Sequence, residues 1–276
     1  MDFGYLGPSG TFTYRGTCEF VHKIQSQLPD EPMRAVPFDT VSDVFAALEA
    51  GEIDYGVAAI DNTVEGPVFA TIDGLLQHPE IVAIADTWLP IQFDAYALAG
   101  DDNFKFGVAH PHALAQVTGA LKQFGVKPLA AASNMAAVIH LEPGQIAFGP
   151  PGSINGWVCA HPHWVLVAEN VGDYPDAKTQ FVLLANRPIS FAPEAASTML
   201  AITPGETGPG VLARITAEFA KRNLNLSALF SRPIKGVAGQ YVFIVTVDAS
   251  PDNPDLIKVR NNLTTAQDNV RILGAW

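Results

Sequence analysis

The sequence predicts an α/β fold in which two similar α/β lobes are followed by a smaller unit. Apolar, strand-like runs alternate with helical patterns over residues 1–188, and strand–helix–strand repeats of this kind form parallel sheets. The apolar run Tyr55–Ile60 passes directly into a polar turn at residues 61–65, as a central strand does at a binding edge. Residues 198–276 show the order strand–helix–strand–strand–helix–strand, which is the order of the split, ferredoxin-like unit.

The first lobe is predicted from short apolar runs that end at Gly, Pro or polar turn residues, and from helices that begin at Thr, Ser or Asp. Its predicted elements are, in order, a strand at 2–6, a helix at 13–27, a strand at 34–38, a helix capped by 39–43 and ending at 50, a strand at 55–60 and a helix through 75–76.

The second lobe is predicted at about residues 77–174 by the same criteria. Its elements are strands at 81–89, 92–98 and 106–109, a helix at 113–124, a strand at 127–132, a helix at 135–141, and strands at 145–148, 164–171 and 179–184. Because the chain returns after two similar lobes, we expect a cleft between them.

The Pro- and Ala-containing residues 186–197 predict a linker, so we expect two domains, at 1–188 and 198–276. The second domain's predicted elements are a strand at 198–203, a helix from 209 to 220, strands at 226–232 and 241–248 around a turn at 235–239, a helix at 254–265 and a strand at 270–273.

Composition narrows the class of function. Of the 276 residues, 48% are hydrophobic and 16% charged, which is typical of a folded globule. The formal net charge of -12 and the lack of a basic stretch argue against nucleic-acid binding. The two cysteines are far apart, the N-terminus lacks a signal-peptide pattern, and no apolar run approaches the roughly 20 residues that span a bilayer. We expect a cytoplasmic protein with a small-molecule substrate.

The turn at residues 61–65 is the strongest candidate for a binding site. In open α/β sheets, ligands bind beside the carboxyl ends of the strands. Asp61, Asn62, Thr63 and Glu65 arrive together at such an end. An ordinary Asx turn that closes the strand is the alternative.

Several segments form a specific set, because they occur together and in order. They are Gly7–Phe12, Tyr55–Gly66, His110–Gln116, Ala168–Val171 and Thr179–Phe181, followed by Pro209–Leu212 and Ser231–Pro233. With these segments the whole chain resembles the prephenate dehydratases that carry a C-terminal ACT regulatory domain. The resemblance implies a catalytic domain with two lobes, like a periplasmic binding protein, and an active site between them.

Members of that family convert prephenate to phenylpyruvate by removing carbon dioxide and the ring hydroxyl together, without a metal or redox cofactor. The resemblance implies that the Thr179 hydroxyl donates to the departing hydroxyl. The implied catalytic residues are Thr179, Asn62, Asp61 and Gln116. The implied substrate-binding residues are Ser9, Gly10, Thr11, Thr63, His112, Gln180 and Phe181, of which the first three form an anion site at a helix N-terminus.

For the C-terminal domain, the resemblance implies a phenylalanine site between two ACT domains, and thus a homodimer or homotetramer. The implied effector-binding residues are Gly210, Val211, Leu212, Asn225, Leu226, Ser231 and Arg232. A dimerisation unit without a ligand is the alternative.

Some positions depart from the family's usual residues. They are Asp61 (usually Glu), Ala109 (Ser), His112 (Gln), Gln180 (Arg) and Phe230 (Glu). Loss of the guanidinium at position 180 removes a bidentate ligand for a carboxylate, and the ring of Phe230 is a candidate to fill the effector pocket.

These departures keep two alternatives open. One is a relative that decarboxylates prephenate without aromatisation or acts on arogenate, and the other is a non-catalytic, amino-acid-sensing binding protein. Chorismate mutase activity ranks low, because it normally needs an extra helical domain and the sequence opens directly with the first dehydratase strand.

The two His-Pro-His runs, at 110–112 and 161–163, raise a metal site as a hypothesis, since side chains two residues apart on an extended strand point the same way. No Cys or acidic third ligand stands near either run in the sequence. We therefore expect no metal and no cofactor.

Overall fold

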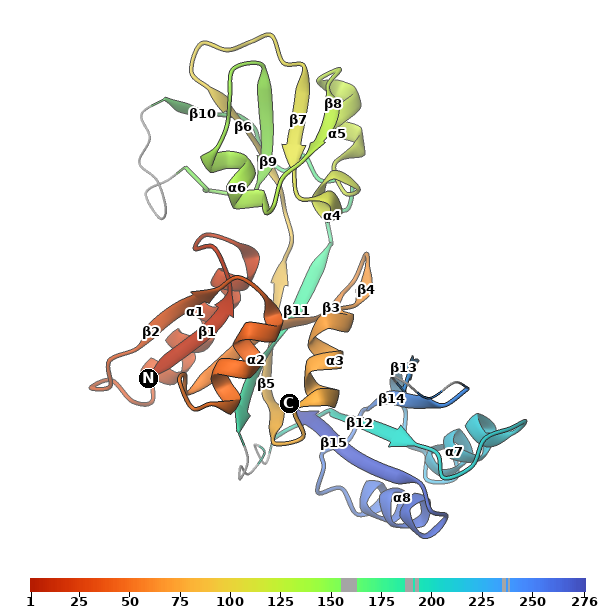
Figure 1. Ribbon diagram of the computed structural model, residues 1–276. Coiled ribbons are helices and arrows are strands. Elements are labelled where there is room, and N and C mark those ends of the chain that lie inside the picture. Colours follow the sequence, from red (N-terminus) through yellow and green to blue (C-terminus); the bar gives the residue numbers. More distant parts are fainter. Residues whose placement is uncertain (155–162, 187–190, 192–193, 235–236, 238) are drawn as a thin grey trace. The chain divides into compact units, whose positions relative to one another are not determined.

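The computed structural model describes residues 1–154, 163–186, 191, 194–234, 237 and 239–276 (Figure 1). The chain divides into two compact units, the first of residues 1–71 and 87–181 and the second of residues 72–86 and 182–276. Three elements, α3 (Phe69–Gln77), β5 (Ile81–Pro90) and β11 (Lys178–Asn186), contribute residues to both units. Strands and helices alternate as the sequence predicts, so the α/β class is confirmed.

The first lobe is a parallel sheet with the order β2-β1-β3. Strand β1 (Asp2–Leu6) lies between β2 (Arg34–Phe38) and β3 (Tyr55–Asn62). Helix α1 (Phe12–Gln25) connects β1 to β2, α2 (Val41–Glu49) connects β2 to β3, and the two helices lie on opposite faces of this sheet (Figure 1).

Side-chain caps explain where these two helices begin. Thr11 accepts a hydrogen bond from the Tyr14 amide at 3.2 Å, which starts α1. Thr40 and Asp43 form a reciprocal capping box at the start of α2. One element was not predicted from the sequence: β4 (Gly66–Pro67) pairs antiparallel with the end of β3 and so folds the polar turn back on its strand.

The second lobe holds a five-stranded sheet with the order β10-β6-β9-β7-β8. Its strands are β6 (Asp94–Leu98), β7 (Phe106–Ala109), β8 (Lys127–Ala130), β9 (Gln145–Gly149) and β10 (Trp164–Ala168). Its helices are α4 (Pro111–Leu114), α5 (Thr118–Gln123) and α6 (Asn134–Ile139).

The single helix predicted at 113–124 is wrong, because the structure breaks it into α4 and α5. The Asp173 carboxylate accepts hydrogen bonds from the backbone amides of Thr118 at 2.7 Å and Gly119 at 2.9 Å, and from the Thr118 hydroxyl at 2.6 Å. Burial raises the pKa of Asp173, but these hydrogen bonds outweigh it and lower the pKa below its ordinary value. The Asp173 carboxylate, which is distant in sequence, thus starts α5 at a point where the local sequence pattern predicts an uninterrupted helix.

The second unit confirms the predicted ferredoxin-like order. Its elements are β12 (Thr198–Thr203), α7 (Val211–Ala220), β13 (Leu226–Pro233), β14 (Tyr241–Val247), α8 (Pro254–Thr265) and β15 (Asn269–Ala275). The strands form an antiparallel sheet with the order β13-β14-β12-β15. Fully buried Ile215 and Phe219 of α7 and Leu256, Val259 and Leu263 of α8 pack on this sheet.

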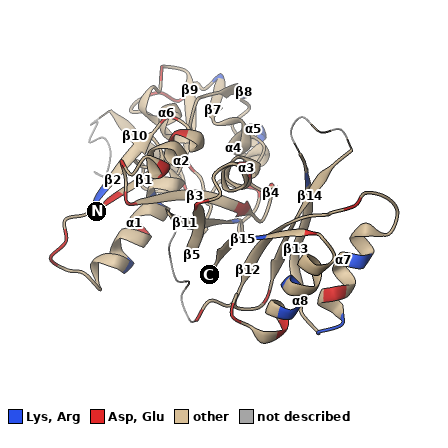
Figure 2. Ribbon diagram, turned by 60° about the horizontal axis from the view of Figure 1, so that its bottom comes forward, with Lys and Arg blue, Asp and Glu red and all other residues tan. Residues whose placement is uncertain are grey.

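Charged residues of both signs lie on many separate elements (Figure 2). Within the residues that the structure describes, no helix combines the length and the apolarity needed to cross a bilayer.

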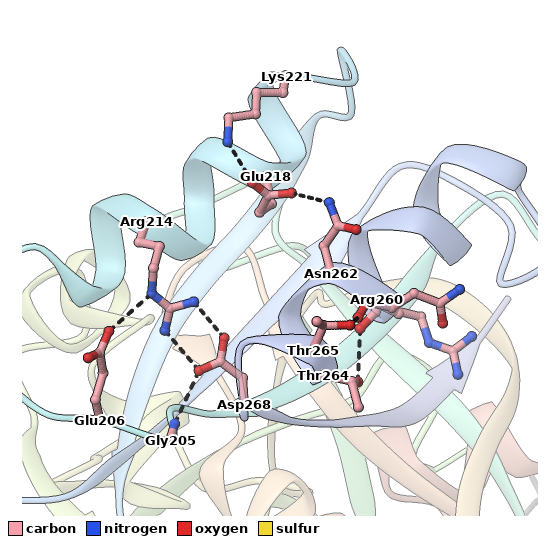
Figure 3. Close-up of polar contacts among 11 residues, drawn as sticks. Gly205, Glu206, Arg214, Glu218, Lys221, Arg260, Asn262, Thr264, Thr265 and Asp268 are labelled. Atoms are coloured by element: carbon pink, nitrogen blue, oxygen red, sulfur yellow. Dashed lines mark hydrogen bonds and ion pairs between the residues drawn. The ribbon is translucent and has the colours of Figure 1, made fainter.

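An ion pair between Arg214 and the buried Asp268 holds the loop between β12 and α7 (Figure 3). Asp268 is 3% exposed and accepts from both terminal nitrogens of Arg214 at 2.8 Å and from the Gly205 amide at 3.1 Å. Burial raises the pKa of Asp268, but the hydrogen bonds and the Arg214 charge outweigh it, so the pKa lies below its ordinary value.

We expect Asp268→Asn to lower the free energy of unfolding by about 1 to 3 kcal/mol at pH 7, the range for a lost hydrogen bond to a charged group. Because the folded-state pKa is depressed, this stabilisation is present above about pH 4 and is lost as the pH falls through the folded-state value. Urea unfolding at pH 7 and at pH 3 measures the effect, with the exposed Asp252→Asn as control. Equal stabilities of wild type and variant at pH 7 would contradict it.

Candidate functional site

The polar turn after β3 is joined to the start of β11 by three hydrogen bonds. The Asn62 amide donates to the Thr179 hydroxyl oxygen at 2.8 Å. The Thr63 amide donates to the Lys178 carbonyl, and the Lys178 amide donates to the Thr63 hydroxyl oxygen, both at 2.9 Å. The structure therefore brings together three of the predicted site residues, Asn62, Thr63 and Thr179.

The orientation of the Asn62 amide follows from its neighbours. Its Oδ1 accepts from the backbone amides of Val64 at 2.8 Å and Glu65 at 2.9 Å, so Nδ2 is the atom that faces Thr179. The Asx turn that was the alternative interpretation is thus present, formed by Oδ1 of Asn62. Nδ2 of the same side chain donates to Thr179 in the candidate site.

The hydroxyl of Thr179 is set up as a donor. It is 7% exposed, and its oxygen already accepts from Asn62. Within the described residues nothing accepts its hydrogen. A hydroxyl carries one hydrogen and two lone pairs, so this hydrogen is available to a bound molecule.

The predicted anion site, Ser9–Thr11, lies at the N-terminus of α1 as expected. Gly10 adopts a φ of 86°, a left-handed conformation that favours glycine. The first-turn amides of Phe12 and Thr13 have no intrahelical acceptors, because no preceding turn supplies carbonyls. Together with the helix dipole they favour an anion.

Side chains of the first lobe pack against the second lobe at this point. The rings of Phe12 and Phe93 are 5.7 Å apart in an edge-to-face arrangement. Val64, from the turn after β3, contacts the same second-lobe core, which includes Val117. The N-terminus of α1 and the polar turn therefore both face the second lobe.

Gln116 is buried beside that contact, with 5% of its surface exposed. Its Oε1 has no hydrogen-bond donor in the part of the chain that the structure describes. A buried, unpaired acceptor costs about 1 to 3 kcal/mol. Such a group is a candidate ligand for a donor on a bound molecule.

Asp61 stands half-buried at the end of β3, one residue before Asn62. Burial raises its pKa, and a hydrogen bond from the Asn62 backbone opposes this rise. The raised pKa makes Asp61 a better proton carrier than an exposed aspartate.

The first His-Pro-His run caps α4. His110 is half-buried, and burial and the neighbouring His112 lower its pKa. Its Nδ1 accepts from the His112 amide at 3.4 Å, while the side chain of His112 is exposed. Within the ranges given above, no cluster of three His, Cys, Asp or Glu side chains could hold a metal ion. Cys159 and His161 lie outside the described residues.

Gln180 and Phe181 follow Thr179 on β11, where successive side chains alternate between faces. Phe181 shares the face of Thr179 and is buried against α1: a Cβ at Gly16 would lie 2.9 Å from its ring. Gln180 is buried on the opposite face. Contact of either side chain with a substrate stays a prediction.

Arg15 is not among the site residues predicted from the sequence. An arginine four residues before a glutamate, here Glu19, ordinarily forms a surface ion pair on a helix. The structure turns Arg15 toward the second lobe instead, where its guanidinium donates to the Pro151 carbonyl. Only the tertiary contact distinguishes the two arrangements.

In the second unit, a groove of about 740 Å³ lies beside the loop that Arg214 and Asp268 hold. The groove is lined by Thr203, Pro204, Glu206, Thr207, Gly208, Gly210, Val211, Leu212, Ala213, Thr216, Leu229, Ile234, Gly239, Gln240, Tyr241 and Phe243. Three predicted effector residues, Gly210–Leu212, therefore line one groove.

The other predicted effector residues, including Leu226 and Ser231, do not line this groove. Asn225 donates to the Asp248 carboxylate at 2.5 Å, and Arg232 binds the Asp73 carboxylate with two nitrogens. Phe230 is also absent from the lining, and alternation along β13 places it on the face opposite Leu229. The expectation that the Phe230 ring fills the effector pocket stays a prediction.

Two known family models match this chain. The family model for prephenate dehydratase matches residues 3–189, and that for the ACT domain matches residues 205–264. The chain belongs to the prephenate dehydratase family.

Its relatives match along the whole length. A prephenate dehydratase of Amycolatopsis methanolica is 29% identical over 277 residues, which cover 99% of this chain and 87% of the relative. The crystal structure of the Staphylococcus aureus prephenate dehydratase superposes with a TM-score of 0.83 at 28% identity and covers 100% of both chains. The Arthrobacter aurescens prephenate dehydratase in complex with L-Phe has the same TM-score and identity, covering 100% of this chain and 89% of that one. The two-lobed catalytic fold with a C-terminal ACT domain is thereby confirmed.

We expect Asn62→Asp to lower the turnover of prephenate by about 10²-fold or more. The carboxylate would accept the hydrogen of the Thr179 hydroxyl and withhold it from the substrate, a loss typical of removed acid–base assistance. The Asx turn should survive, because a carboxylate oxygen still accepts from the Val64 and Glu65 amides. Steady-state kinetics and thermal unfolding check both parts, with the exposed Asn261→Asp as control. Near-normal turnover would show that this hydrogen is not used.

Proposed function

We propose that this protein is a prephenate dehydratase, which forms phenylpyruvate, carbon dioxide and water from prephenate and supplies L-phenylalanine biosynthesis. The observation that carries the proposal is the hydrogen bond from Asn62 to Thr179, because it leaves one hydroxyl hydrogen free at the predicted catalytic position. The family match supports the substrate.

The reaction needs few groups. The electron pair of the bond to the leaving carboxylate moves into the ring while the carbon–oxygen bond of the ring hydroxyl breaks, and the ring becomes aromatic. The hydroxyl leaves with the carbon–oxygen electron pair, and one proton taken up from the solvent completes the water molecule. Thr179 donates a hydrogen bond to the departing hydroxyl, and the Asn62 amide stabilises the charge that develops on the threonine oxygen. The amides at the start of α1 hold a carboxylate of the substrate.

Incubating the purified protein with prephenate and identifying the product tests the proposal. Phenylpyruvate supports it. A dihydro product would favour the non-aromatising decarboxylase, and no product together with amino-acid binding would favour the sensor.

We expect Thr179→Ala to lower turnover by about 10²-fold or more, since it removes the hydroxyl. Thr179→Ser, which keeps the hydroxyl, should retain most of the activity. Rates of phenylpyruvate formation give the answer, and thermal unfolding reports on folding. Thr264→Ala, which removes an exposed hydroxyl of α8 that donates to the Arg260 carbonyl of its own helix, is the control. An Ala variant as active as the Ser variant would remove Thr179 from the mechanism.

We further propose that L-phenylalanine regulates the enzyme by binding the groove beside Gly210–Leu212, with a second copy of the chain completing the site in a homodimer or homotetramer. The largely apolar lining suits an aromatic side chain, and the loop amides suit a carboxylate. A relative with an L-Phe complex supports the choice of ligand. A cytoplasmic location is part of the same proposal.

We expect calorimetric titration with L-phenylalanine to show binding, and activity to change with a coupling of about 1 to 3 kcal/mol. Leu212→Glu should abolish both effects, because it places a carboxylate in the apolar groove. Leu129→Glu, at a leucine of similar exposure in the second lobe, is the matched control. The absence of heat and of any activity change at millimolar ligand would leave this unit as a dimerisation element.

A further inference from the structure

Arg15 extends from α1 toward the second lobe. Phe12 and Arg15 are three residues apart and share a helix face, and the Arg15 guanidinium lies 5.7 Å from the centre of the Phe12 ring. Phe12 packs on Phe93, and Arg15 donates to the Pro151 carbonyl, both in the second lobe. The guanidinium therefore stands on the same inter-lobe face as the anion-binding start of its own helix.

The charge of Arg15 is not balanced by a bonded carboxylate. Burial lowers its pKa, although the nearby Tyr96 and Asp94 oppose this. Asp94 is itself engaged, accepting from the Asn170 amide at 3.0 Å and from the Tyr96 hydroxyl at 3.3 Å. In the part of the chain that the structure describes, Arg15 forms no ion pair.

Other arginines in the structure behave differently. Arg34, Arg214, Arg222 and Arg232 each pair with a carboxylate of this chain. A guanidinium has five N–H donors, and Arg15 directs one of its terminal nitrogens to a neutral carbonyl. A half-buried cation with unused donors, beside a helix N-terminus that already favours anions, suits a carboxylate supplied by a ligand.

We propose that Arg15 binds a carboxylate of the substrate and is a specificity-determining residue for dianionic substrates. The inference rests on the proposed function, since prephenate carries two carboxylates. The amides at the start of α1 take one carboxylate, and the Arg15 fork takes the other through charge-assisted hydrogen bonds. A positive charge at position 180 of β11, where the family usually has Arg, is then not needed to bind this carboxylate, because Arg15 of α1 supplies the guanidinium.

Arg15→Gln tests this assignment. We expect the KM for prephenate to rise by about 10-fold or more while kcat changes by less than about 3-fold, because ground state and transition state both lose the contact. Arg15→Lys keeps the charge without the fork and should give an intermediate KM. Arg34→Gln, at an exposed arginine paired with Asp2, should change neither constant.

A second measurement separates binding from mere packing. Free guanidinium at millimolar concentration should lower the KM of Arg15→Ala toward that of wild type, and should not affect Arg34→Ala. A role limited to holding Pro151 would show as a lower unfolding temperature with an unchanged KM, and that result overturns the inference. If Arg15→Gln does not fold, the KM of the Arg15→Lys variant and the guanidinium rescue still test whether Arg15 binds the substrate.

Calorimetric binding of prephenate, compared with and without Arg15→Gln in protein that also carries Thr179→Ala to slow consumption of the ligand, keeps this test independent of the reaction. Wild-type protein that binds prephenate but forms no phenylpyruvate would sink the proposed function. A binding constant at least about 10-fold weaker in Arg15→Gln would still support the role of Arg15. Equal binding by both proteins overturns it whether or not phenylpyruvate forms.

Discussion

The catalytic unit depends on the junction between the turn after β3 and the start of β11. Asn62 uses its two ends for different tasks, since Oδ1 shapes the turn and Nδ2 fixes the Thr179 hydroxyl. Two hydrogen bonds between Thr63 and Lys178, one between backbone groups and one from the Lys178 amide to the Thr63 hydroxyl, hold the two segments in one register. A shift of either segment would break all three contacts, so the position of the reactive hydroxyl is determined by backbone geometry as much as by its own side chain.

Helix α1 is fitted to this junction from the other side. Gly16 permits close contact with the Phe181 ring, which shares a face of β11 with Thr179. Phe12 packs edge-to-face on Phe93, so the helix N-terminus faces the second lobe. The same placement explains Arg15. Because α1 lies between β11 and the second lobe, the Arg15 guanidinium meets the Pro151 carbonyl, while the nearby Asp94 carboxylate is already hydrogen-bonded.

In the second unit, the Arg214–Asp268 ion pair shapes the groove without lining it. Glu206, which lies 3.4 Å from the Arg214 guanidinium, does line the groove. Arg214 and Asp268 hold Gly205 in place, and the loop that follows supplies the groove wall. Arg232 is bound to Asp73 of α3, so it supports the sheet and is not free for an effector. A side chain in a family signature can therefore serve the architecture of a site and lie outside the site itself.

The sequence by itself determined the α/β class, the ferredoxin-like order of the last unit and the residues at the end of β3, because hydrophobic periodicity and turn chemistry are local properties. It also pointed to Thr179 and Asn62, through motifs that occur in a fixed order. It did not show the break between α4 and α5, because Asp173 caps α5 from a distant part of the chain. The contact of the Phe181 ring with Gly16, the unpaired oxygen of Gln116 and the turning of Arg15 away from Glu19 were decided only by the tertiary structure, since each depends on which distant group occupies the space beside it.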